Sequence, residues 1–340
     1  MMIIPKKLKK GDTIAIIAPS SGISSFFPNR IKHAKKIFES LGFKVKIFPT
    51  CSKFHEGSAG KINERLKDIH DAFSKNDIKA IICAIGGISS NELINKIDYN
   101  IIKKNPKIFC GYSDISILHY AIQKKTNLIT FYGPAALTQF AEFPSPFNYT
   151  IDYFLKVLTQ TKPVGSIIPS KSWTDQVVPW DKEKIKRRNL IKNSGYEWLK
   201  NGTATGKLIG GCIYSINQLF ETKFNLNYTD KIIFLENSEG QDMTKGDPIE
   251  ILKSQLQDLK NRKIFDNSKG LIIGKLYGYS IDEKNEIKKY IKNLLVKFNF
   301  PILYGVNVGH TDPIITIPLG RNVTLNSKKN IFSIDQAGVQ

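Results

Sequence analysis

The sequence predicts an α/β protein with a parallel sheet in its first half and an α+β domain in its second. Two observations lead to this prediction. Short apolar runs typical of buried strands alternate with helix-periodic segments through the first half. In the second half, the last three apolar runs follow one another without an intervening helix, which favours antiparallel or barrel-like strands; they are Ile314–Leu319, Val323–Leu325 and Ile331–Ile334.

The first half can be followed element by element. A strand is expected at Thr13–Pro19, an apolar run that ends at the turn residues Ser20-Ser21-Gly22. A helix is expected over Asn29–Leu41, where apolar residues recur at helical spacing and Gly42 follows at a position typical of helix ends. The alternation continues with strands at Lys44–Pro49, Ala80–Ile85 and Lys107–Cys110 and with helices over Ile62–Phe73, from Glu92 onwards and through Gln123. Because strands joined by helices run parallel, ligands are expected at their carboxyl ends.

The middle of the chain differs in composition from both halves. Residues 161–205 contain all three tryptophans, several prolines and a basic run, which indicates an inter-domain crossover with a long loop. The length of 340 residues suits two domains, so we predict an N-terminal domain at 1–160, the crossover at 161–205 and a C-terminal domain at 206–340. In the last, strands are expected at Lys231–Leu235, Gly270–Gly274 and Ile302–Val308, and helices at Pro248–Lys260 and Asp282–Phe298.

The formal net charge of +20 allows two interpretations. A basic protein can bind nucleic acid, and its field also attracts anionic small substrates. Here the lysines are spread along the whole chain and no nucleic-acid-binding module is recognisable. We therefore favour a lysine-rich surface and expect no nucleic-acid partner.

Neither a secretory signal nor a membrane span is expected. The opening residues, MMIIPKKLKKGD, contain too short an apolar stretch for a signal, and no segment reaches the roughly 18 apolar residues that a bilayer requires. The four cysteines are scattered without a C-x-x-C pair, which argues against a zinc site or a disulfide framework. We expect a cytoplasmic protein without a membrane partner.

The strongest candidate for chemistry is Ser113, in the segment Gly111-Tyr112-Ser113-Asp114. A strand is expected to end at Gly111, and the serine lies in the turn that opens the next helix. This is the setting of a nucleophile elbow, in which a tight turn presents the hydroxyl beside the helix amides. The second glycine of that motif is absent, and helix N-capping is the competing role for Ser113.

A serine nucleophile needs a base, and the base needs an orienting acid. Of the five histidines, His310 is the best candidate base, because it follows the apolar run Ile302–Val308 and lies in a loop at a strand end. Glu236 ends the run Lys231–Leu235 and is the candidate acid. A structural loop histidine and a salt-bridged or helix-capping glutamate are the alternatives.

Acyl transfer also needs amide donors for the oxyanion. One candidate is the amide of Asp114, which directly follows the nucleophile. The other lies in Ile85-Gly86-Gly87, where the missing side chains let the backbone approach a ligand. A plain tight turn between strand and helix is the alternative for the two glycines.

Taken together, these segments resemble one family, the LD-carboxypeptidases of peptidoglycan recycling and the related microcin C immunity peptidases. The resemblance runs in order along nearly the whole chain. Its segments are Ala15-Ile16-Ile17-Ala18-Pro19-Ser20-Ser21, Ile85-Gly86-Gly87-Ile88-Ser89-Ser90-Asn91, Ile97-Asp98-Tyr99, Gly111-Tyr112-Ser113-Asp114, Gly210-Gly211, Leu235-Glu236-Asn237, Gly309-His310-Thr311-Asp312-Pro313 and Ile317-Pro318-Leu319-Gly320.

The resemblance implies a Rossmann-like N-terminal domain with the nucleophile and a C-terminal domain with a small β-barrel-like sheet and the other two triad residues. It implies a triad of Ser113, Glu236 and His310, with an oxyanion hole from the amides of Gly87 and Asp114. It also implies a homodimer, an active site between the domains, and neither a metal nor a cofactor.

Within the family, the immunity branch is the better match. The segment from Gly86 to Asn91 resembles that branch, whereas LD-carboxypeptidases typically have an arginine before the glycines and an aromatic residue after them. The stretch from Trp173 to Trp180 resembles the long loop of that branch, in which an aromatic ring can stack on a nucleotide base. We therefore expect substrate contacts from Gly86, Ser89, Trp180 and Trp173. Packing of the loop is the alternative role for the tryptophans.

We predict a serine-type carboxypeptidase or amidase that cleaves an amide bond in a small peptide or an aminoacyl-nucleotide conjugate. One alternative is an LD-carboxypeptidase that trims muropeptides, and another is a binding protein that has this fold without catalysis. The chain departs from the family at Cys212, which stands after Gly210-Gly211 where an asparagine is usual. This departure removes the amide side chain usual at that position and leaves the triad unaffected.

Overall fold

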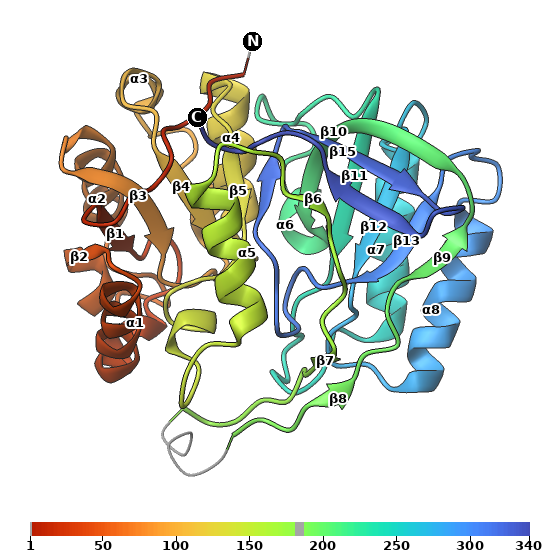
Figure 1. Cartoon of the computed structure of the whole chain (residues 1–340), viewed down its shortest axis with the longest axis horizontal. Helices are drawn as coiled ribbons and strands as arrows, with labels where there is room; N and C mark the ends of the chain where they lie inside the picture. Colours follow the sequence, from red (N-terminus) through yellow and green to blue (C-terminus); the bar gives the residue numbers. More distant parts are fainter. Residues whose placement is uncertain (1, 181–186) are drawn as a thin grey trace.

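The computed structural model describes residues 2–180 and 187–340, which form two large sheets flanked by helices. The two halves of the chain lie side by side (Figure 1). The predicted α/β fold, with a parallel-strand sheet in the N-terminal region and a second sheet in the C-terminal region, is confirmed. Every helix in the two described ranges is too short or too polar to cross a membrane.

The first sheet has six strands in the order β14-β5-β4-β3-β1-β2. Neighbouring strands from β2 to β5 pair in parallel. The strands β1, β3 and β4 are mostly apolar, with Lys79 an exposed exception in β3, because both faces of the sheet are covered. The strands are β1 (Thr13–Ile17), β2 (Lys44–Ile47), β3 (Ile78–Cys83), β4 (Ile108–Gly111), β5 (Thr130–Tyr132) and β14 (Ile317–Leu319).

Helices cover both faces of this sheet. The helices α2 (Ile62–Ser74), α3 (Tyr99–Lys104) and α4 (Ile115–Thr126) pack on one face, and α1 (Pro28–Ser40) and α5 (Asn148–Thr159) pack on the other. The helix α4 is buried along most of its length, because it also contacts α6 (Ile213–Asn217) and β10 (Thr203–Cys212) of the second half. The helix that follows Ser113 is therefore held between the two sheets.

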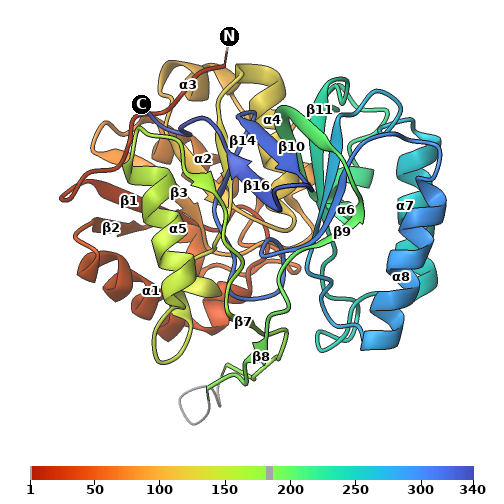
Figure 2. The same cartoon turned by 45° about the vertical axis from the view of Figure 1, so that its right-hand side comes forward.

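The second sheet has eight strands in the order β6-β16-β15-β10-β11-β12-β13-β9. The four strands β10 to β13 are parallel, and the strands on either side of them are antiparallel. The helices α7 (Ile249–Asn261) and α8 (Ile281–Leu294) lie side by side at the outer end of this half (Figure 2). The remaining strands are β6 (Gly165–Ser166), β9 (Glu197–Lys200), β11 (Lys231–Glu236), β12 (Gly270–Gly274), β13 (Ile302–Val306), β15 (Asn322–Asn326) and β16 (Ile331–Ile334).

Two segments differ from the sequence-based expectation. Residues 314–319, expected among the strands of the C-terminal domain, supply β14, which pairs antiparallel with β5 of the first sheet. The crossover contributes β6, β9 and the start of β10 to the second sheet, and it also forms the short ribbon β7 (Ser172–Trp173) and β8 (Ile191–Lys192). Its residues 181–186 lie outside the described residues.

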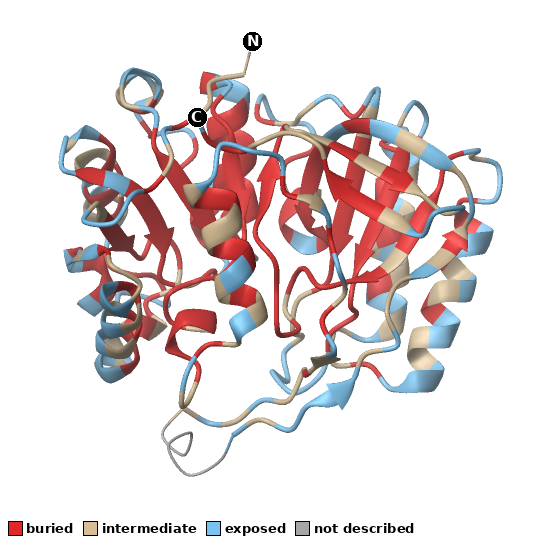
Figure 3. Ribbon diagram, in the orientation of Figure 1, coloured by how far each residue is buried: buried red, intermediate tan, exposed pale blue. Residues whose placement is uncertain are grey.

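The hydrophobic core is shared between the two halves. Each of its two clusters contains buried residues from both sheets, and the strands of both sheets are largely buried (Figure 3). The boundaries at residues 160 and 205 stay a prediction. The shared core means that side chains at the carboxyl ends of the two sheets are held at fixed positions relative to one another.

Candidate active site

Ser113 lies in the turn between β4 and α4. Its φ of 64° is in the left-handed region, which costs a non-glycine residue about 1–2 kcal/mol. A Cβ on Gly86 would lie 2.7 Å from Cβ of Ser113 and 3.0 Å from its Oγ, so the neighbouring loop can come this close only with glycine there. The N-cap position of α4 belongs to Asp114, so helix capping does not account for Ser113. A strained serine between strand and helix is the geometry of a nucleophile elbow.

A buried tyrosine connects this serine to the second sheet. The backbone N–H of Ser113 donates to the hydroxyl oxygen of Tyr132 at 3.1 Å, and that hydroxyl donates to Oε1 of Glu236. Tyr132 ends β5 and Glu236 ends β11, and both are almost completely buried. The hydrogen bond therefore crosses from one sheet to the other. It satisfies one oxygen of a carboxylate that would be costly to bury without a donor.

The second oxygen of Glu236 contacts the imidazole of His310. Nδ1 of His310 lies 2.7 Å from Oε2, in the loop that follows β13. A Cβ on Gly309 would lie 2.4 Å from the same Oε2, and Gly309 has a φ of 106°, so only glycine lets this loop pass the carboxylate. Ser113, Glu236 and His310 are thus linked through Tyr132 by consecutive hydrogen bonds.

His310 is surrounded by acidic groups. Its Nε2 faces Oε2 of Glu239 at 3.3 Å. Burial alone lowers the pKa of His310, but the carboxylates of Glu236 and Glu239, helped by Asp312, outweigh burial and raise that pKa to about 9. The imidazole is therefore mainly protonated at neutral pH. Its outer nitrogen is paired with Glu239 and not with the hydroxyl of Ser113.

Two backbone amides beside Ser113 have no acceptor among the residues that the structure describes, those of Gly87 and Asp114. The Asp114 nitrogen lies 3.2 Å from the position that a Cβ on Gly86 would take, so it faces the glycine loop. Gly87 has a φ of 146°, and a Cβ there would lie 2.5 Å from Oγ of Ser20. Free amides on both sides of a serine are what an oxyanion hole needs.

The carboxylate of Asp114 fastens this loop to the nucleophile turn. Its Oδ2 accepts the hydroxyl of Ser20 at 2.5 Å and the backbone N–H of Ser90 at 2.9 Å. Ser89, predicted to contact substrate, has its hydroxyl bound to the guanidinium of Arg65 at 3.1 Å inside the protein. In this structure Ser89 therefore supports the loop from within.

Both candidate tryptophans pack against the protein. The ring of Trp180 meets Phe27 edge-on at a centroid distance of 4.8 Å, and the guanidinium of Arg30 lies 4.6 Å from its centroid. The ring of Trp173 has the ammonium groups of Lys284 and Lys275 at 4.7 and 5.2 Å. Both rings are half-buried, so packing is at least part of their role, and a contact with substrate stays a prediction.

Arg188 ties the crossover to the loop that carries His310. Its guanidinium pairs with Glu142 at 2.5 Å and with Asp312 at 2.7 Å. Thr174 and Asp312 also exchange backbone hydrogen bonds of 2.7 and 2.9 Å. The position of His310 is therefore fixed from two sides, by Glu236 in the second sheet and by the crossover.

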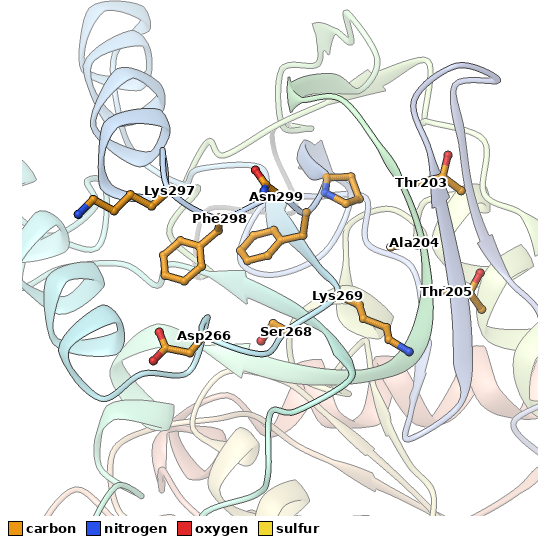
Figure 4. A pocket seen from close by; sticks show the side chains of 11 residues that line it. Thr203, Ala204, Thr205, Asp266, Ser268, Lys269, Lys297, Phe298 and Asn299 are labelled. Carbon is orange, nitrogen blue, oxygen red and sulfur yellow. The ribbon is translucent and has the colours of Figure 1, made fainter.

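Two other features do not belong to this site. Nε2 of His119 donates to the carbonyl of Gly111 at 2.9 Å, and burial lowers its pKa to about 4, so this histidine supports the end of β4. A hollow of about 590 Å³ lies at the amino-terminal end of strands β10, β12 and β13 and contains none of the candidate residues (Figure 4). Thr203, Thr205, Lys269, Lys297 and Phe298 are among the residues that line it. In the described ranges, no group of three or more His, Cys, Asp or Glu is arranged to hold a metal ion.

Tyr132, Glu239 and Arg188 belong to the site but were not predicted from the sequence. Glu239 could have been predicted as a site residue, since it stands three residues after Glu236 in the segment that ends the same strand. Tyr132 ends a short apolar run before Gly133-Pro134 and could be singled out only by its position at a strand end. Arg188 lies in a basic run that carries no pattern.

Comparisons with known proteins agree with this architecture. Residues 14–133 match the LD-carboxypeptidase N-terminal domain, and residues 205–325 match the LD-carboxypeptidase C-terminal domain. YocD of Bacillus subtilis, a candidate carboxypeptidase, is 34% identical over 92% of this chain and 93% of its own. The chain belongs to the LD-carboxypeptidase family. Another family member, the microcin C7 self-immunity protein MccF of Escherichia coli, is 30% identical over 98% of this chain and 96% of its own.

Solved structures of the family have the same fold. MccF without ligand superposes with a TM-score of 0.91 at 27% identity and covers 99% of this chain and 100% of its own. An MccF-like protein from Bacillus anthracis has a TM-score of 0.89 at 35% identity, with 98% and 99% covered. Other structures show MccF with aspartyl sulfamoyl adenosine and with glutamyl sulfamoyl guanosine. The predicted resemblance to LD-carboxypeptidases and microcin immunity peptidases is confirmed.

Proposed function

We propose that the protein is a serine peptidase that cleaves an amide bond in a small peptide or an aminoacyl-nucleotide conjugate, with a triad of Ser113, His310 and Glu236. The observation that carries the proposal is the series of hydrogen bonds from the Ser113 amide through Tyr132 to Glu236 and His310. It supports the triad because residues from two sheets, far apart in the sequence, meet around one buried carboxylate.

In the proposed reaction, Nε2 of neutral His310 takes the hydroxyl proton of Ser113 as Oγ attacks the scissile carbonyl carbon. The amides of Gly87 and Asp114 donate to the oxyanion. Nε2 then protonates the leaving nitrogen as the C–N bond breaks. The same imidazole next takes a proton from a water molecule, whose oxygen attacks the acyl carbon. It returns this proton to Oγ of Ser113 as the ester bond breaks, which frees the acid product. Glu236 accepts from Nδ1 throughout, which keeps the tautomer fixed and stabilises the imidazolium.

The substrate class rests on the relatives. MccF, which superposes over the whole chain, has been solved with an aspartyl and with a glutamyl sulfamoyl nucleoside. In both compounds an aminoacyl group is joined to a nucleoside through a sulfamoyl group. An MccF-like protein of Streptococcus pneumoniae, with a TM-score of 0.83 at 26% identity, has been solved with AMP. These likenesses favour a conjugate with a nucleotide part over a plain peptide.

A muropeptide is the second candidate substrate. A candidate murein peptide carboxypeptidase of Bacillus subtilis is 28% identical over 98% of this chain and 95% of its own. The two candidates differ in the leaving group, a nucleoside derivative or a D-amino acid. Incubation of the purified protein with an aminoacyl sulfamoyl adenosine and with a tetrapeptide that ends in an L,D bond separates them by the product seen in mass spectrometry.

Ser113→Ala tests the nucleophile. We expect turnover of the better substrate to fall by several powers of ten, because the remaining binding groups supply only residual catalysis. Ser52→Ala, which changes an exposed serine, is the matched control and should leave turnover unchanged. A serine-reactive phosphonate should modify Ser113 of the unaltered protein. If the protein remained unmodified and cleaved neither substrate, it would be a binding protein on this fold.

A further inference from the structure

Carboxylates gather around His310 although the chain as a whole is strongly basic, with a net charge of +20. Glu236, Glu239 and Asp312 all raise the pKa of this histidine. Asp312 in turn shares the guanidinium of Arg188 with Glu142. The surroundings of the candidate base are therefore locally acidic, which is opposite to the character of the surface.

Of these four carboxylates, only Glu239 is open to a ligand. The side chain of Glu236 is fully buried, and those of Asp312 and Glu142 are 7% and 8% exposed and paired with Arg188. The side chain of Glu239 is 36% exposed, and its ion pair is with Nε2 of His310. A cation that enters from solvent thus meets Glu239 first.

The pairing of Glu239 with Nε2 is incompatible with general-base catalysis. Nε2 is the atom that must take the proton of Ser113, and an imidazolium held between Glu236 and Glu239 cannot accept one. The remaining groups that face the ring are Tyr112 and Tyr277, at centroid distances of 5.0 and 6.3 Å. Burial raises the pKa of both phenols, so they stay uncharged at neutral pH and do not compete for the proton. His310 can therefore lose its proton and act as the base only when Glu239 no longer pairs with Nε2.

We propose that Glu239 binds a cationic amino group next to the scissile carbonyl of the substrate and that this contact frees His310 to act as the base. This inference rests on the proposed function. An α-ammonium group is two bonds away from the carbonyl carbon that Ser113 attacks, so it arrives beside the His310–Glu239 pair. Once Glu239 is paired with the ammonium, the imidazole loses one of its carboxylate partners, gives its proton to solvent and turns Nε2 to Ser113. The substrates are then unblocked aminoacyl compounds, and N-acylated ones are poor substrates.

A pair of phosphonate probes tests this inference without knowledge of the leaving group. Both probes are diphenyl esters of an α-aminoalkyl phosphonate, one with a free amine and one N-acetylated. In each case Oγ of Ser113 forms a bond to phosphorus and phenol leaves with the hydroxyl proton. The rate of adduct formation is measured by intact-protein mass spectrometry at pH 7. We expect the free-amine probe to react at least ten-fold faster with the unaltered protein.

Glu239→Gln should abolish this preference, because a neutral side chain neither attracts the amine nor holds the proton on His310. Glu239→Asp, which keeps the charge, should restore part of it. Asp242→Asn is the matched control in the same loop, since Asp242 is exposed and its carboxylate accepts from the backbone and the hydroxyl of Thr244 in that loop; this variant should keep the full preference. Equal rates for the two probes, or a preference that survives in Glu239→Gln, would overturn the inference about Glu239 and leave the proposed function standing. Failure of both probes to modify Ser113 would instead overturn the proposed function.

Discussion

Replacement of Glu239 by glutamine removes one carboxylate from His310 and keeps the size of the side chain. We expect this variant to be more active at neutral pH toward a substrate that lacks an amine. The reason is that catalysis requires the neutral imidazole, whereas the carboxylates raise the pKa of His310 to about 9. Activity therefore rises as the pH increases through that pKa, and the variant should show the same rise at lower pH.

The expected change in the pKa of His310 follows from the distance of 3.3 Å between Nε2 of His310 and Oε2 of Glu239. Two unit charges at that distance interact by about 1.3 kcal/mol in water and by about 5 kcal/mol at an effective dielectric constant of about 20. Because the side chain of Glu239 is 36% exposed, solvent screens it and the lower figure applies. That energy corresponds to about one pKa unit, so the neutral fraction of His310 at pH 7 should rise from roughly 1% to roughly 10%.

The assay is the pH dependence of kcat/KM for an N-acetylated aminoacyl substrate between pH 6 and pH 10. We expect the midpoint of the acidic limb to move down by about one unit and kcat/KM at pH 7 to rise about ten-fold. Glu39→Gln, which alters an exposed glutamate paired with Lys35 on α1, is the control and should not move the midpoint. A midpoint in Glu239→Gln that is unchanged or higher would show that Glu239 does not hold the proton on His310.

Further predictions concern the residues around the triad. Ser113→Ala should lower turnover by about three to six powers of ten without a change in the circular dichroism spectrum, and an active variant would exclude Ser113 as nucleophile. Tyr132→Phe leaves the Ser113 amide and an oxygen of Glu236 without a partner, so the free energy of unfolding in urea should fall by about 2–4 kcal/mol, and an unchanged value would contradict the role of this phenol. Gly86→Ala places a methyl group 2.7 Å from Cβ of Ser113, so steady-state kinetics should show kcat falling more than KM changes; normal kcat would mean that the loop moves freely. Finally, the pKa of His310 in the folded protein lies above its ordinary value of 6.5, so the stabilisation by this protonated histidine is complete below pH 6.5 and is lost as the pH rises to about 9. The free energy of unfolding in urea, measured for the unaltered protein and for His310→Gln below pH 6.5 and above pH 9, should therefore differ more at the lower pH.

Much of the first sheet was predictable because its central strands are buried on both faces. The buried parts of such strands read as uninterrupted apolar runs, as in residues 14–17 and 80–83, and the helices between the strands have apolar residues at helical spacing. The strand Ile317–Leu319 could not be assigned to this sheet in the same way. Its three residues pair with β5, which is distant in the sequence. The sequence around residues 317–319 does not indicate which strand they pair with.

The candidate site was predictable to the extent that its residues end strands. Ser113 and Glu236 follow apolar runs, and parallel topology brings such positions to one edge of a sheet. Tyr132 could not be recognised in this way, because a phenol at the end of an apolar run resembles any core aromatic residue. Its role comes from Glu236, a partner 104 positions away in the other sheet. The acidity around His310 was equally hidden, since the net charge of the chain has the opposite sign.

The pairing of β14 with β5 affects how the first sheet is completed during synthesis. The strands β1 to β5 are made before β14, so the outer edge of β5 lacks its partner strand until residues 317–319 have emerged from the ribosome. An unpaired strand edge invites pairing with other chains. The nascent first half therefore exposes the unpaired edge of β5 while residues 133–316 are being made, and β14 covers this edge only afterwards.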